Sequence, residues 1–256
     1  IGPLDRPAYR KATSDILKKA DFCIFRDSLA KREAFEICPR GDFVSAIDPA
    51  AYCATLFQRS QSAPQPKKQI AINLRKISWE YKGVDTAGCF ERFAVDLVKK
   101  VMNENDGYKV VLVPHHYFFF GGDDRTFMNT IKYRIGSREL QIQNEPLSLR
   151  ATMQLFAAST FCIGMRFHAM LLMTLLNGRC RILNYTGGKG GKIQGFLNDF
   201  DPEHFFDFRR MLPLDSDQLG FSAFDRLLED DECFKPPEHL LDEAFQSYRT
   251  ALSEFT

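Results

Sequence analysis

"TFCIGMRFHAMLLMTLLNGRCRILNY", residues 160–185, has two short apolar runs on either side of a longer apolar segment. Apolar runs of about four to eight residues are typical of buried strands, and the middle segment is long enough for a helix. Asn177 and Gly178 end that segment, as is common at helix C-termini because glycine readily adopts a left-handed conformation. The stretch predicts a strand at 160–165, a helix at 167–178 and a strand at 180–185, the unit from which parallel sheets are built.

The same alternation continues upstream of this unit. Further strands are predicted at residues 69–75, 108–116 and 140–144, and further helices at residues 88–103, 123–136 and 147–159. Asp123 is a natural N-cap for one of these helices, and Gly136 is a natural stop. Regular alternation of this kind favours an α/β fold, here a Rossmann-like parallel sheet flanked by helices.

The segment at residues 58–69 is polar and contains two prolines, so we expect a linker there. Before it, the pattern predicts a helix at 7–19, a strand at 22–27 and a helix at 28–37. These elements are too few for a conventional domain. We therefore expect residues 1–64 to be the tail of an N-terminal Rossmann-like lobe whose first part precedes this chain. Residues 65–256 are expected to form a C-terminal Rossmann-like lobe with a closing helix at 237–255.

Charge and cysteine content narrow the function classes. The chain has 256 residues, of which 45% are hydrophobic, and its formal net charge is +1. A charge so close to zero gives no footprint for nucleic acid. Seven cysteines without a CxxC pair indicate neither a disulfide framework nor a thiolate zinc site, so we expect a reducing, cytoplasmic environment. No apolar run approaches the roughly 20 residues of a spanning helix, so we expect no membrane span.

Arg166 and His168 follow the strand at 160–165, where polar side chains are unexpected in an otherwise apolar stretch. Open α/β sheets bind ligands beyond the carboxyl ends of their strands, where the next helix begins. A guanidinium can hold a carboxylate or phosphate with two hydrogen bonds, and an imidazole can transfer a proton near neutral pH. The alternative is that these residues pair only with a neighbouring carboxylate and a backbone carbonyl.

A glycine-rich segment at residues 185–200 follows the last of these strands and contains Gly188, Lys189 and Lys192. Backbone N–H groups in such a loop can surround an anion, with the lysines adding charge. The segment lacks the Walker pattern, which excludes that type of ATP site. A surface turn is the alternative.

The segment at residues 114–124 raises the question of a metal because it contains His115, His116, Asp123 and Asp124. Adjacent histidines on extended backbone point to opposite sides and form a poor chelate. We therefore expect no metal site, and favour aromatic side chains that line a sugar or apolar pocket.

Three more polar residues lie near predicted strand ends. Arg26 ends the strand at 22–27, and Asn73 and Arg75 lie near the end of the strand at 69–75. The arginines could surround the same cleft as Arg166, although a salt bridge is the more usual role for such a residue.

In chain order, several segments resemble the polysaccharide pyruvyl transferase family. They are FRDSLAKR (25–32), AIDPA (46–50), IAINLR (70–75), VVLVPHH with the following DD, ASTFCIGMRFHAMLLMTLLNG (158–178), and ILNY with KIQGFLNDF. The most specific match is the RxH element at Arg166 and His168, followed by Tyr185 and Lys192. The resemblance covers nearly the whole chain. It departs from the family pattern at Ala30 and Lys31, near an expected serine, and in the longer spacing from Tyr185 to Lys192.

The resemblance implies a GT-B-like architecture of two Rossmann-type lobes. It also implies transfer of a pyruvyl group from phosphoenolpyruvate onto two hydroxyls of a sugar in a glycan, which forms a ketal and releases phosphate. In this interpretation His168 is the catalytic acid or a phosphate contact, and four residues bind the donor: Arg26, Arg166, Phe167 and Lys192. The remaining pocket candidates are Asn73, Arg75, His115, His116, Tyr185, Gly188 and Lys189.

Phosphoenolpyruvate is a substrate here, so no cofactor is expected, while a divalent ion and a homo-oligomer stay open. The partners are then a small-molecule donor and a glycan acceptor. Two other functions remain open on the same fold. One is a nucleotide-sugar glycosyltransferase or epimerase, and the other is a non-catalytic glycan-binding domain.

Overall fold

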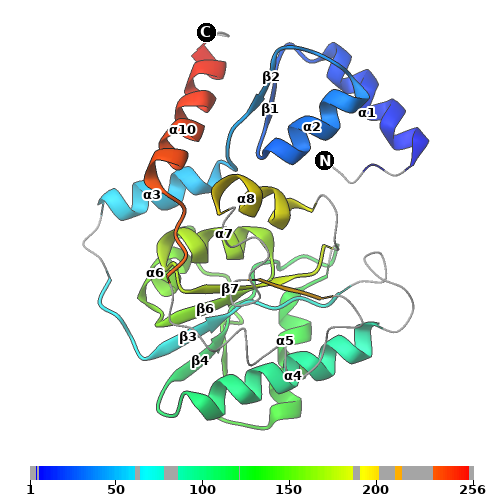
Figure 1. Cartoon of the computed structure of the whole chain (residues 1–256). Coiled ribbons are helices and arrows are strands. Elements are labelled where there is room, and N and C mark those ends of the chain that lie inside the picture. The colour runs from blue at the N-terminus through cyan, green and yellow to red at the C-terminus, as the bar shows by residue number, and fades with distance from the viewer. Residues whose placement is uncertain are drawn as a thin grey trace. The chain divides into compact units, whose positions relative to one another are not determined.

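The computed structural model describes residues 4, 6–60, 64–77, 86–120, 122–186, 191–201, 211–214 and 233–253 (Figure 1). The chain divides into two compact units. The first comprises Ile1–Tyr52, Thr186–Phe205 and Pro236–Thr256, and the second comprises Cys53–Tyr185 and Phe206–Lys235. Along the chain, the first unit ends at Tyr52 and resumes at Thr186, and the predicted domain boundary between residues 64 and 65 stays a prediction. That residues 1–64 are the tail of an N-terminal lobe stays a prediction.

The described part of the second unit contains a six-stranded sheet in which every neighbouring pair is parallel. Its strands are β3 (Gln69–Ile72), β4 (Lys109–Leu112), β5 (Gln141–Ile142), β6 (Phe161–Gly164), β7 (Cys180–Asn184) and β8 (Met211–Pro213). Their order in the sheet is β5-β4-β3-β6-β7-β8, which is the order of a dinucleotide-binding Rossmann sheet. The predicted α/β class is therefore confirmed. β8 was not predicted, because a three-residue strand carries little periodic signal.

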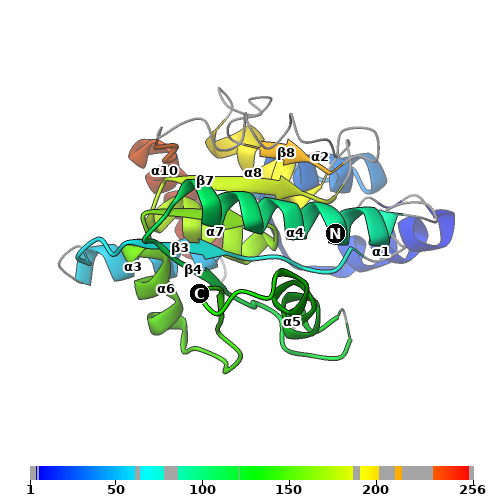
Figure 2. The ribbon, with the colours of Figure 1, turned by 90° about the horizontal axis from the view of Figure 1, so that it is seen from below.

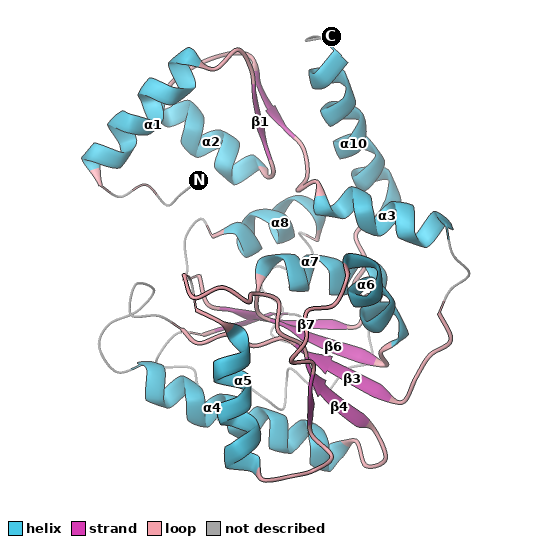
Figure 3. Ribbon diagram, turned by 180° about the vertical axis from the view of Figure 1, so that it is seen from behind, coloured by secondary structure: helices cyan, strands magenta, loops and turns pink. Residues whose placement is uncertain are grey.

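Helices cover both faces of this sheet. They are α4 (Thr86–Glu104), α5 (Asp124–Ile135), α6 (Leu149–Ala158) and α7 (Phe167–Leu176). Figures 1 and 3 show α4 and α5 on one face and α6 and α7 on the other, and Figure 2 views the sheet from the side of α4 and α5. The predicted caps of α5 are confirmed: Asp123 accepts from the N–H of Arg125 at 2.9 Å, and Gly136 is left-handed with φ 71°. None of the helices within the described ranges is long and apolar enough to cross a membrane.

Helix α7 is the most buried helix of the described part of the chain. All of its residues are buried except His168, as expected for a helix that is apolar on every side. It packs closely on β6 at Gly164, where an added Cβ would lie 2.9 Å from the Cα of Met170. The absence of a side chain at Gly164 thus sets the separation of helix and strand.

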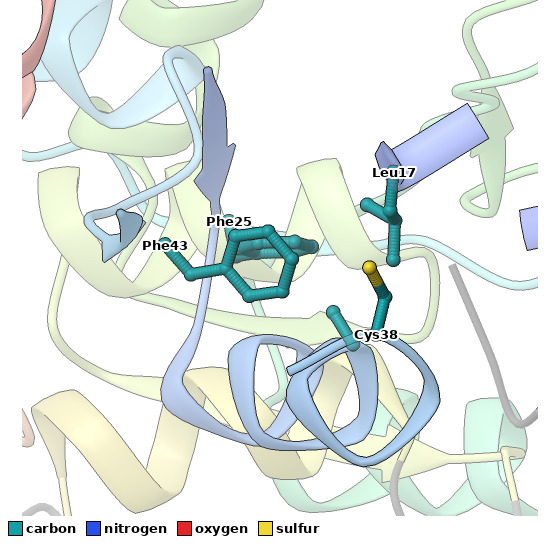
Figure 4. Packing of buried hydrophobic residues seen from close by; sticks show 5 residues of the cluster. Leu17, Phe25, Cys38 and Phe43 are labelled. Carbon is teal, nitrogen blue, oxygen red and sulfur yellow. The ribbon is translucent and has the colours of Figure 1, made fainter. Parts of the chain in front are cut away.

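The first unit has its own small core (Figure 4). Its elements are α1 (Pro7–Lys19), β1 (Cys23–Phe25), α2 (Ser28–Ile37), β2 (Phe43–Ser45), α8 (Lys192–Phe200) and α10 (Glu238–Ser253). β1 and β2 form a parallel pair. Leu17, Ala34 and Cys38 pack with Phe25 and Phe43, whose ring centroids are 5.2 Å apart.

Within the first unit, α8 is joined to the N-terminus of α2. Asp199 accepts from the N–H of Ser28 at 2.6 Å and also from its hydroxyl. An added Cβ at Gly195 would lie 2.5 Å from Cγ of Asp27, the residue that caps α2. These contacts hold α8, which begins at Lys192, against the start of α2, which follows Arg26 in the chain.

Helix α3 (Ala50–Ser60) was not predicted. The linker prediction at 58–69 is wrong for residues 58–60, which form the last turn of this helix. Asp48 accepts from the N–H of Ala50 at 3.0 Å, and Pro49 next to it is suited to a helix start. Ala51 and Ala54, one turn apart, are fully buried. The cap signal at 48–49 could have located the helix.

Replacing Gly164 with alanine tests the packing of α7 on β6. The added methyl meets backbone that cannot rotate away, so we expect the free energy of unfolding to fall by about 1–3 kcal/mol in urea denaturation. Gly88→Ala in α4 is the control, because an added Cβ there meets open space. We expect that variant to be neutral or more stable by up to about 1 kcal/mol. Equal stability of the two variants would contradict the close packing.

Candidate functional site

The sheet order reverses between β3 and β6, and this switch point is where open α/β sheets bind ligands. Asn73 follows β3 and Arg166 follows β6. The Oδ1 of Asn73 accepts from the backbone N–H of Arg166 at 2.8 Å, and its Nδ2 donates to the carbonyl of Val113 at 2.9 Å. Asn73 is fully buried. Its amide therefore joins the ends of three neighbouring strands, and its predicted pocket contact stays a prediction.

The guanidinium of Arg166 forms a bidentate ion pair with the carboxylate of Asp124. Its Nε lies 2.9 and 3.0 Å from the two carboxylate oxygens, and its NH2 lies 2.6 Å from Oδ1. The NH2 also donates to the carbonyl of Gly122 at 3.0 Å. These partners are a carboxylate and a backbone carbonyl, as in the alternative weighed from the sequence. They fix the plane of the guanidinium at the carboxyl edge of the sheet.

Asp124 is the centre of this arrangement, and its side chain is only 1% exposed. Its Oδ2 also accepts from the backbone N–H groups of His115 and His116, each at 3.1 Å. The carboxylate lies in the first turn of α5, where the helix dipole favours a negative charge. The sequence pattern suggested Asp124 only as a metal ligand and did not reveal this role. A second aspartate directly after the N-cap was the available signal.

His115 and His168 belong to the same cluster. Burial lowers the pKa of His115 most, the charges of His168 and Arg166 act in the same direction, and the three effects together bring this pKa to about 4. His115 is therefore neutral near pH 7, and its ring stacks on Phe156 at 6.3 Å. His168 is exposed in the first turn of α7, with its ring edge-on to Phe167 at 5.3 Å. The influence of His168 and Arg166 on His115 shows that these three side chains lie near one another, and their roles in a site stay predictions.

The side chain of His116 contacts different groups from those that the side chain of His115 contacts. Its Nδ1 lies 3.2 Å from the carbonyl of Gly122, and its ring is edge-on to Phe118 at 5.6 Å. The two histidines therefore take different directions. Within the described ranges, no three His, Cys, Asp or Glu residues are grouped so that they could hold a metal ion.

Arg75 and Tyr185, two separate pocket candidates, lie against each other. The guanidinium of Arg75 lies over the ring of Tyr185 at 4.7 Å from its centroid, and its Nε donates to the carbonyl of Lys76 at 3.2 Å. Arg75 is 7% exposed and Tyr185 is 2% exposed. A ligand contact by either side chain stays a prediction.

The other candidates are less well placed by the structure. Phe167 is buried, so the donor contact predicted for it would have to use its backbone. Arg26 and Lys192 belong to the first unit, where Arg26 lies 3.5 Å from Asp27, and their part in donor binding stays a prediction. Gly188 and Lys189 lie outside the described residues.

Solved structures with a similar fold are GT-B glycosyltransferases at low identity. A trehalose-6-phosphate structure from E. coli bound with UDP-2-fluoro glucose has a TM-score of 0.52 and 16% identity, covering 95% of this chain and 61% of that chain. The apo structure of OtsA has a TM-score of 0.52 and 15% identity, covering 94% and 60%. The chain thus spans about 60% of the length of these structures. The likeness shows a GT-B-like lobe and nothing about substrates.

A sequence comparison with curated proteins gave no match. The family model described as polysaccharide pyruvyl transferase matches residues 1–187. The matched region includes β6, α7 and the Asp124, Arg166 and His168 cluster, and it ends before Lys192. Because this match covers more than half of the sequence, the chain belongs to the polysaccharide pyruvyl transferase family.

Proposed function

We propose that this protein transfers a pyruvyl group from phosphoenolpyruvate to two hydroxyls of one sugar in a glycan, forming a ketal and releasing phosphate. Membership of the family supports the transfer of a pyruvyl group to a polysaccharide. The observation that carries the finer proposal is the cluster of Arg166, His168 and neutral His115 at the switch point of the sheet. A guanidinium and an imidazole at that edge suit an anionic donor whose reaction begins with a proton transfer.

The reaction needs one proton delivered to carbon. Protonation of the methylene carbon of phosphoenolpyruvate forms a C–H bond and leaves an oxocarbenium-like centre at carbon 2. The first sugar hydroxyl adds there and loses its proton, the C–O bond to phosphate breaks, and the second hydroxyl adds to the same carbon. One hydroxyl proton replaces the proton that the acid delivered, and the other leaves with phosphate. No oxidant or reductant is required.

His168 is the proposed acid for the first step. Its side chain is exposed in the first turn of α7, so a substrate can reach it. His115 next to it is neutral near pH 7, because burial, together with the charges of His168 and Arg166, lowers its pKa to about 4.

Arg166 is the proposed clamp for the carboxylate or phosphate of the donor. Asp124 and the carbonyl of Gly122 accept from its Nε and NH2, and these contacts hold the guanidinium in one orientation. A guanidinium held in one plane is already oriented before the ligand arrives, which reduces the entropic cost of binding. Arg26 and Lys192 are further proposed donor contacts.

The donor can be identified with the full-length protein. We expect phosphoenolpyruvate, and not UDP-glucose, to raise the midpoint of thermal unfolding, because binding to the native state stabilises it. We also expect phosphate release that depends on a glycan whose sugar hydroxyls can close a five- or six-membered ketal ring. Stabilisation by UDP-glucose alone would favour a nucleotide-sugar enzyme. Binding of glycan without any phosphate release would favour a non-catalytic domain.

His168→Ala tests the acid in the same phosphate assay. We expect turnover to fall by about 10²- to 10⁴-fold, the usual contribution of a general acid. The midpoint of thermal unfolding should not change, because the side chain is exposed. His239→Ala is the matched control, since His239 is an exposed histidine on α10. Unchanged kinetics in His168→Ala would exclude a catalytic role.

Asp124→Asn tests whether the ion pair positions Arg166. It keeps the shape of the side chain but removes the charge, so we expect the free energy of unfolding in urea to fall by about 2–4 kcal/mol. We also expect a lower kcat/KM for phosphoenolpyruvate. Asp123→Asn is the control: this carboxylate is 22% exposed and pairs with Arg125, and asparagine caps helices as well as aspartate does. That change should cost at most about 1 kcal/mol, and similar losses in both variants would contradict the special role of Asp124.

A further inference from the structure

Three consecutive phenylalanines form an exposed surface after β4. Phe118, Phe119 and Phe120, which we call the Phe118–Phe120 tip, are 72%, 91% and 86% exposed. Exposed large apolar groups that gather in one place mark an interaction site more often than single ones do. The proposed chemistry uses none of these rings, so they need another explanation.

The tip begins and ends at the candidate site. On one side, the ring of Phe118 is edge-on to His116 at 5.6 Å. On the other side, the carbonyl of Gly122 accepts from Arg166 at 3.0 Å and lies 3.2 Å from Nδ1 of His116. Any molecule that covers the tip therefore lies next to the residues proposed to act on the donor.

The chain that leads into the tip is also held in place. The hydroxyl of Tyr117 donates to the carbonyl of Pro114 at 2.8 Å, and Arg125 lies over the Tyr117 ring at 5.3 Å from its centroid. Because the base of the tip is fixed, less conformational entropy is lost when a ligand covers the exposed rings.

We propose that the Phe118–Phe120 tip binds sugar rings of the acceptor glycan beside the reacting centre, an inference that rests on the proposed function. One face of a pyranose carries mainly C–H groups, which pack on an aromatic ring while the hydroxyls stay in water. The ring centroids of Phe119 and Phe120 lie 5.8 Å apart, and the two ring planes make an angle of 82°. They form an angular surface that suits two consecutive sugars of a bent chain rather than one flat molecule.

A lipid surface fits the same rings less well. Loops that insert into anionic membranes combine apolar side chains with uncompensated cations. Here Arg125, which follows the tip in the chain, is paired with Asp123, and Arg166, which donates to the carbonyl of Gly122, is paired with Asp124. The local charge is therefore nearly balanced, which favours a neutral polyhydroxylated partner.

The test measures glycan binding by the full-length protein without phosphoenolpyruvate. Saturation-transfer NMR would use hexasaccharides of glucose, mannose, galactose and N-acetylglucosamine, and a Phe119→Ser/Phe120→Ser variant. We expect binding of at least one hexasaccharide and a dissociation constant raised by about tenfold or more in the variant, since each aromatic contact changes affinity roughly 2- to 12-fold. Tyr133→Ser is the control, because Tyr133 is 87% exposed near the other end of α5. It should bind as the unmodified protein does.

Several outcomes would overturn the inference. They are no binding of any hexasaccharide, equal binding by the variant, or binding to phosphatidylglycerol vesicles that the variant loses. If the double variant fails to fold by circular dichroism, the single variants Phe119→Ser and Phe120→Ser decide in its place. Failure of the proposed function can be told apart from failure of this inference. If the protein binds glycan through the tip but never releases phosphate, only the proposed pyruvyl transfer is contradicted. If the Phe119→Ser/Phe120→Ser variant still turns over with unchanged acceptor binding and KM, the result contradicts glycan binding by the tip but leaves the proposed function standing.

Discussion

The buried carboxylate of Asp124 is the constraint on which the candidate site depends. An uncompensated charge in the interior is costly, and Asp124 is compensated by the guanidinium of Arg166, by two backbone N–H groups and by the N-terminus of α5. These partners come from three separate parts of the chain. A single residue thereby sets the path of the backbone after β4, the start of α5 and the orientation of Arg166.

Asn73 has a comparable role at the ends of β3, β4 and β6. Its amide satisfies one N–H after β6 and one carbonyl after β4 at the point where the sheet order reverses. In many sheets this point is open to a ligand. Here the buried side chain of Asn73 joins the ends of the strands, while the side chain of His168 is exposed.

The polar residues Arg166 and His168 and the apolar Phe118–Phe120 tip suit different parts of the proposed transfer reaction. In the proposed reaction, Arg166 would contribute a positive charge and His168 a proton to the anionic donor. The Phe118–Phe120 tip offers apolar area without net charge, which suits a sugar chain. Both surfaces rest on the same short connection between β4 and α5, because Gly122 contacts Arg166 while Phe118 contacts His116.

The amino-acid sequence by itself determined the α/β class, most helices of the sheet-bearing unit, the caps of α5 and the position of Arg166 and His168 at a strand end. These features depend on periodicity and on neighbours within one or two turns. It did not reveal helix α3, the short strand β8 or the partner of Arg166. Only the tertiary structure decided that Arg166 pairs with Asp124, because that choice follows from the order of the strands, in which β4 and β6 lie on either side of β3. Strand order depends on packing between residues far apart in the chain, and local patterns do not encode it.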